Sequence, residues 1–104
     1  MIHKKLLQDI KTRLQVAFST RFKGVVLYGS EAKNEAHADS DIDLLVLLNS
    51  PIILWEDTHA IIDALYDLQL QILRPIHVTP VDVEAYEDGE YALFRNAKRE
   101  GISA

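Results

Sequence analysis

The chain has no cysteine among its 104 residues, which excludes disulfide bonds and thiolate metal sites. It also lacks any run that approaches the roughly 20 apolar residues of a membrane-spanning helix. Basic residues are few: 11 lysines and arginines stand against 16 acids, and the formal net charge of −5 disfavours nucleic-acid binding through bulk electrostatics. The start of the chain has the pattern of an amphipathic helix that contains Asp9, unlike the apolar core of a signal peptide. These absences favour a cytoplasmic protein whose partner is neither a membrane nor a nucleic acid.

What the chain does contain is typical of an ordinary globular domain. Hydrophobic residues make up 48% of it and charged residues 26%. This length supports one hydrophobic core, so we expect a single domain over residues 1–104. An acidic surface suits a basic protein partner better than DNA or RNA, and assembly with further copies of the chain stays open.

Hydrophobic periodicity predicts an α+β fold in which a small mixed β-sheet of three to four strands is covered by helices. The expected helices cover residues 2–19, 54–70 and 91–100. The expected strands cover residues 24–28, 42–48 and 76–78. Glu84–Glu90 is expected to be a solvated loop, and the alternative is a docking surface for a basic protein. Trp55 and Tyr66 are expected to pack into the core or a partner surface.

Two acids, one residue apart, open the second of these strands. Asp41 and Asp43 lie on the same face of an extended chain because side chains alternate between the two faces. At a rise of about 3.3 Å per residue their Cβ atoms are roughly 6.6 Å apart. Carboxylates at that spacing can converge on a divalent metal ion. The alternative is a solvated turn that runs into a strand by chance.

A Gly-Ser turn ends the preceding strand, and ten residues separate it from Asp41. The backbone N–H groups of such a turn and the Ser30 hydroxyl suit a phosphate. A short helical turn expected over residues 30–37 would direct its N-terminus toward the same phosphate. The phosphate-binding turn and the carboxylate pair together predict a metal-dependent enzyme that handles nucleotides.

Gly29-Ser30, ten residues and then Asp41-x-Asp43 resemble the signature of the DNA polymerase β-type nucleotidyltransferase superfamily. The short chain is similar to its minimal nucleotidyltransferase branch, many of whose members are antitoxins encoded beside HEPN-domain toxins. The resemblance implies that Gly29 and Ser30 bind a nucleoside triphosphate, while Asp41 and Asp43 bind Mg²⁺ for in-line attack on the α-phosphate. It also implies transfer of AMP from ATP to a hydroxyl of a HEPN-type toxin.

Two positions depart from the pattern of that superfamily. Lys33-Asn34 stands where many members have Arg-Gly, and Lys33 keeps a positive charge near the phosphates without the bidentate fork of arginine. His77 stands in the last expected strand, where members often carry a third carboxylate, and we expect it at the same rim as Asp41 and Asp43. The chain is therefore either a nucleotidyltransferase or a degenerate relative that neutralises its partner by contact. A small-molecule acceptor is disfavoured, because members of that kind carry extra domains.

Overall fold

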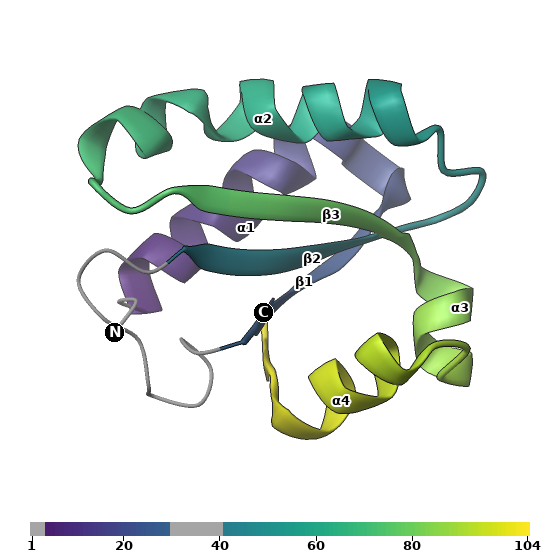
Figure 1. The fold of residues 1–104 in the computed structure, drawn as a ribbon. Helices are drawn as coiled ribbons and strands as arrows, with labels where there is room; N and C mark the ends of the chain where they lie inside the picture. The colour runs from purple at the N-terminus through teal and green to yellow at the C-terminus, as the bar shows by residue number, and fades with distance from the viewer. Residues whose placement is uncertain (1–3, 30–40) are drawn as a thin grey trace.

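The computed structural model describes residues 4–29 and 41–104. Within them, helices cover both faces of one β-sheet (Figure 1). The elements in chain order are α1 (Lys4–Phe18), a short 3-10 helix η1 (Ser19–Arg21), β1 (Phe22–Tyr28), β2 (Ile42–Leu48), α2 (Leu54–Gln71), β3 (Ile76–Asp82), α3 (Val83–Asp88), α4 (Ala92–Glu100) and β4 (Ile102–Ser103).

The sheet is mixed, and its strand order is β3-β2-β1-β4. Strand β2 is antiparallel to β1 and parallel to β3, while β4 pairs antiparallel with β1. The parallel β2–β3 pair is joined by the long helix α2, as a parallel connection requires. Consequently β2 and β3 begin at the same end of the sheet, which is the left end in Figure 1.

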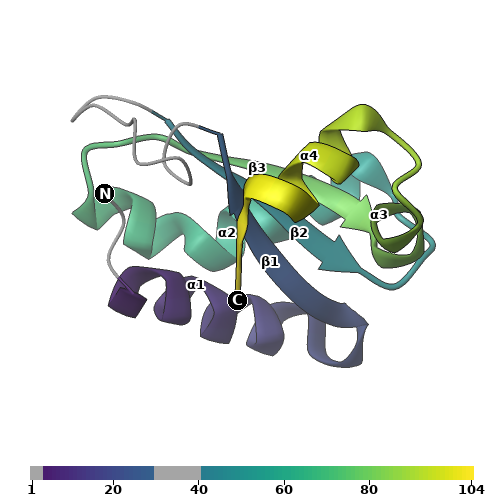
Figure 2. The same ribbon diagram turned by 90° about the horizontal axis from the view of Figure 1, so that it is seen from below.

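Strand β2 supplies both halves of the core because it is apolar on both faces. Its even-numbered residues, Ile42 to Leu48, pack against α1 and α2. Leu45 and Leu47 point the other way and pack with buried residues of α3 and α4. Figure 2 shows α3 and α4 on the near side of the sheet, with α1 and α2 behind it. A strand covered on both sides fits the uninterrupted apolar run in the sequence.

Most of the elements expected from periodicity are confirmed within the described residues. The three long helices and the three expected strands are all present, and β2 has the predicted bounds. The α+β class with a small mixed sheet is confirmed as well, with four strands. The helical turn expected over residues 30–37 lies outside the described residues. No helix in the described part of the chain is long and apolar enough to cross a membrane.

The region after β3 differs from the expectation. Strand β3 continues to Asp82, four residues beyond the predicted end, and Glu84–Glu90 is not a solvated loop, because α3 occupies most of it. The Asp82 carboxylate caps α3 by accepting the backbone N–H of Glu84 at 3.1 Å, and Gly89 ends the helix in the left-handed conformation at φ 66°. Tyr86 then anchors α3 by burying its ring in the second core cluster.

The chain end also differs. The last residues form the short strand β4, which periodicity does not predict, and Ala104 directly after it exchanges backbone hydrogen bonds with Val25.

Candidate active site

Three side chains form one row across the sheet at the end where β2 begins. Asp43 of β2 lies opposite Tyr28 of β1 and opposite His77 of β3. The Nδ1 atom of His77 is 3.4 Å from Oδ1 of Asp43. The His77 side chain is 67% exposed and that of Asp43 is 27% exposed, so the row runs from the half-buried interior of the sheet to solvent.

Asp41 lies just before β2 and is exposed. Alternation along an extended chain would place it on the face that carries Asp43. At the entrance of a strand that is buried on both faces, both carboxylates would be expected to be partly desolvated, but Asp41 is exposed. The reason is that β2 starts only at Ile42, whose N–H donates to Pro75 O at 2.8 Å. Asp41 therefore lies just outside the hydrogen-bonded strand.

The end of β1 brings a backbone turn against the Asp43 carboxylate. Gly29 has φ 76°, a conformation that L residues rarely adopt. A Cβ atom at this position would lie 2.9 Å from Oδ2 of Asp43. The turn therefore approaches the carboxylate more closely than a residue with a side chain would allow. The other two residues proposed for nucleotide binding, Ser30 and Lys33, lie outside the described residues.

Tyr28 adds a phenol to the site that the sequence reading missed. Burial raises the pKa of its hydroxyl above the ordinary value, and the negative charge of Asp43 raises it further. A hydrogen bond with Thr79 acts in the opposite direction. The hydroxyl therefore stays protonated at neutral pH, so Tyr28 contributes a neutral polar group beside the carboxylate.

A glutamine in α2 fixes the start of β3 and hence the position of His77. The side-chain oxygen of Gln69 accepts the N–H of Ile76 at 2.7 Å, and its amide nitrogen donates to Arg74 O at 3.0 Å. These two bonds close the turn between α2 and β3. Sequence reasoning missed Gln69 because nothing in a helical pattern identifies a residue that reaches the following turn.

A pocket of about 180 Å³ opens beside the row, between the end of β1 and α4. Its lining residues are Tyr28, Gly29, Leu93, Asn96, Ala97 and Glu100. Gly29 therefore borders both the Asp43 carboxylate and an open space on the same face of the sheet.

The carboxylates fit an ion that arrives with a nucleotide. Magnesium is usually held by one or two protein carboxylates, because substrate phosphates and water fill its remaining positions. Asp41 and Asp43 supply hard oxygen donors of that kind and number. Within residues 4–29 and 41–104, no three His, Asp or Glu side chains are grouped so that they could hold a metal ion by themselves.

Comparison with protein families identifies the family of the chain. The family model described as "Polymerase beta, Nucleotidyltransferase" matches residues 8–103. The chain belongs to this nucleotidyltransferase family. The matched range spans β1, β2 and β3 and thus contains Tyr28, Asp43 and His77. No curated protein matches the chain significantly. Family membership supports nucleotidyl transfer as the general activity.

Proposed function

We propose that this nucleotidyltransferase moves AMP from ATP to a hydroxyl of a partner protein, and that the partner is a HEPN-type toxin which the chain counteracts. The observation that carries the proposal is the half-buried Asp43 carboxylate, which lies against the Gly29 turn and beside an open pocket in a chain of this family. The reaction would take place in the cytoplasm, where ATP is abundant.

In this proposal Asp41 and Asp43 hold Mg²⁺ together with the triphosphate, and the ion supplies positive charge that offsets the charge of the phosphates. Gly29 and Ser30 hold the phosphates. The acceptor oxygen bonds to the α-phosphorus while the bond to the pyrophosphate oxygen breaks, and pyrophosphate leaves. Nδ1 of His77 faces Asp43, which leaves Nε2 to accept the proton of the acceptor hydroxyl.

The second candidate function is contact inhibition of the partner without turnover. It is favoured by His77, an imidazole at the place of a third carboxylate, because Mg²⁺ prefers oxygen ligands. In this case the row would serve nucleotide binding or partner contact only.

Nucleotide binding is tested by calorimetry with ATP and Mg²⁺. We expect Asp41→Asn with Asp43→Asn to abolish the binding heat, since both oxygen donors for the ion lose their charge. The matched control is Asp88→Asn, which removes an exposed acid from α3 and should bind as the wild type does. Undiminished binding by the double variant would refute the assignment of the two carboxylates.

Transfer is tested with ATP labelled at the α-phosphate and the partner that co-purifies with the chain. If the site is catalytic but weakened, His77→Asp should raise the rate of labelling because it restores a carboxylate opposite Asp43. Full activity of His77→Ala would show that this residue takes no part. If the wild type transfers no label and His77→Asp gains none, contact inhibition is the function.

A further inference from the structure

Helix α2 carries an exposed apolar stripe on the side that faces away from the core. Its members recur at intervals of three or four residues, so they lie along one face of the helix. They are Trp55, His59, Ile62, Tyr66 and Leu70, which we call the α2 stripe. Trp55 is 74% exposed, Tyr66 59% and Leu70 69%. Apolar side chains gathered at this density on a surface are typical of an interaction site.

The stripe is hollowed at two places, so it can accept side chains of another molecule. Near its start, an open pocket is lined by Trp55, His59 and Ile62 together with two neighbours, and the Trp55 and His59 rings lie 4.2 Å apart between centroids. Further along, a smaller pocket lies between Tyr66 and the edge strand β3. Tryptophan and tyrosine that flank pockets are the residue types that supply most binding energy at protein interfaces.

A row of acids borders the stripe. Glu56, Asp63 and Asp67 follow one another at intervals of seven and four residues, which places them side by side along the helix next to the stripe. Asp67 already pairs with Arg13 of α1 at 2.7 Å. Helix α2 contains neither lysine nor arginine. A second copy packed through this face would bring acids toward acids, so charge complementarity favours a different, basic partner.

The position of the stripe links it to the candidate active site. The C-terminal end of α2, where Leu70 lies, leads directly into β3. Strand β3 starts beside the start of β2, so Leu70 and the row of Asp43 and His77 belong to the same end of the molecule (Figure 1). A protein bound along α2 would therefore lie at the end of the molecule that carries the site, on the opposite face of the sheet from Asp43.

From these observations we infer that the α2 stripe binds an amphipathic helix of a partner protein that carries basic residues along one side of its apolar face. The apolar face covers Trp55, Tyr66 and Leu70, and the basic side lies over Glu56 and Asp63. Identification of this partner as the acceptor of the nucleotidyl group rests on the proposed function, whereas the docking itself does not.

The chain supplies its own reporter, because Trp55 is its only tryptophan and lies in the stripe. The probe is a tryptophan-free synthetic helical peptide of about 18 residues, with leucines on one face and lysines beside them. A second peptide has glutamate in place of each lysine. Without nucleotide or Mg²⁺, we expect the lysine peptide to shift the Trp55 emission to shorter wavelength, and the glutamate peptide to bind at least about tenfold more weakly.

Variants distinguish specific docking from nonspecific binding to apolar surface. Tyr66→Ser with Leu70→Ser should weaken the lysine peptide about tenfold or more, since it keeps Trp55 and removes two exposed contacts. The control Val16→Ser alters a side chain of α1 that is 81% exposed and should leave binding unchanged. Glu56→Lys with Asp63→Lys should reverse the preference between the two peptides. All of these changes are at exposed positions, and circular dichroism checks that each variant is folded.

Two results would overturn the inference. Equal binding of both peptides by the wild type and the charge-reversed variant would show that no basic partner is selected. A blue shift that grows with protein concentration alone, together with a dimer in sedimentation that Tyr66→Ser with Leu70→Ser abolishes, would assign the stripe to a second copy. Neither result involves nucleotide, so failure of docking and failure of the proposed transfer are distinguishable.

Discussion

At the scale of single residues, the close approach of Gly29 to Asp43 makes the position of the Asp43 carboxylate depend on the conformation of the turn. A methyl group at position 29 would lie 2.9 Å from Oδ2 of Asp43, and the backbone at φ 76° is strained for any L residue. The closest neighbour is the end of a side chain, which can move. The loss of stability on substituting Gly29 therefore has two contributions. One is backbone strain, and the other is the steric contact with Asp43.

We predict that Gly29→Ala lowers the free energy of unfolding by about 1–2 kcal/mol through backbone strain. It should also weaken the binding of ATP and Mg²⁺, because the displaced Asp43 carboxylate leaves its position beside the turn. Urea denaturation measures the first effect and calorimetry the second.

The control for this prediction is the same substitution made in an Asp43→Ala background. There the backbone part remains, but the contact with Oδ2 is gone, so Gly29→Ala should destabilise the protein less than it does in the wild type. Equal destabilisation in both backgrounds would show that the turn and the carboxylate are independent.

At the scale of elements, Gly101 determines how closely α4 and β4 join the sheet. A Cβ atom there would collide with Ala97 O, and would lie 2.7 Å from Cγ1 of Val26 and 2.9 Å from Leu27 O. The backbone at Gly101 is extended, at φ −80°, so the need for glycine is one of space and not of conformation. A glycine directly after a helix is typical of a helix end, and at Gly101 the structure adds that β1 packs directly against it.

We predict that Gly101→Ala destabilises the protein by about 3 kcal/mol, because two of the three nearest atoms belong to backbone that cannot move aside. Gly89→Ala is the matched control: its Cβ would meet only the flexible side chain of Arg95, so the left-handed conformation leaves a cost of about 1 kcal/mol. Thermal or urea unfolding of both variants provides the comparison. Similar losses for the two would contradict the steric account of Gly101.

The elements differ in how well the sequence predicts them. Strand β2 was predicted residue by residue because burial on both faces leaves an unbroken apolar run between polar ends. Helix α3 was not predicted, since six residues hold too few helical repeats to stand out and its one anchor is Tyr86. Strand β4 has two residues and exists only through pairing with β1, which no local pattern records.

The residues of the candidate site also differ in how well the sequence predicts them. The placement of His77 beside Asp43 followed from the family resemblance, which sets β3 next to β2, together with side-chain alternation. The register puts the two residues side by side. The roles of Tyr28 and Gln69 did not follow. Tyr28 reaches the carboxylate through the β1–β2 register, and Gln69 reaches the start of β3 through a turn, so both depend on tertiary contacts.

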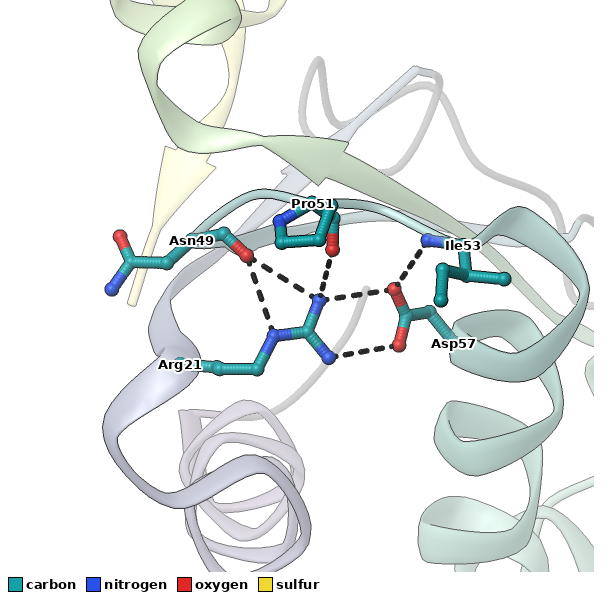
Figure 3. A network of polar contacts seen from close by, with 5 residues as sticks. All are labelled: Arg21, Asn49, Pro51, Ile53 and Asp57. Carbon is teal, nitrogen blue, oxygen red and sulfur yellow. Dashed lines mark hydrogen bonds and ion pairs between the residues drawn. The ribbon is translucent and has the colours of Figure 1, made fainter.

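At the scale of the whole molecule, one ion pair joins three segments at the end of the sheet away from the candidate site (Figure 3). The guanidinium of Arg21 donates to both carboxylate oxygens of Asp57, at 3.0 and 3.1 Å, and to the backbone oxygens of Asn49 and Pro51. Asp57 also accepts the N–H of Ile53, just before α2. The start of β1, the end of β2 and the start of α2 are thus held by one network.

Asp57 is the buried charged side chain of the described core, so its charge depends on these partners. The hydrogen bond with Arg21 lowers the pKa of Asp57 below the ordinary 3.8, burial opposes the shift, and the bond from Ile53 adds to it. Because the pKa is lower in the folded protein, the unfolded chain takes up this proton at a higher pH than the folded protein does. The stabilisation is therefore complete above the ordinary pKa and is lost as the pH falls through the folded-state value.

We predict that Asp57→Asn lowers the free energy of unfolding by about 2 kcal/mol at pH 7, because charged hydrogen bonds to Arg21 are lost. The difference from the wild type should shrink as the pH falls from about 4 toward 2, since the wild-type carboxylate then gains the proton that makes it resemble asparagine. Urea denaturation of both proteins at a series of pH values measures this difference in the free energy of unfolding. The contributions of the other carboxylates are common to both proteins and cancel. Asp67→Asn removes an exposed pair with Arg13 and should cost less than about 0.5 kcal/mol at every pH. A gap between wild type and Asp57→Asn that is constant from pH 7 to 2 would mean that the network acts through shape alone, without the charge of Asp57.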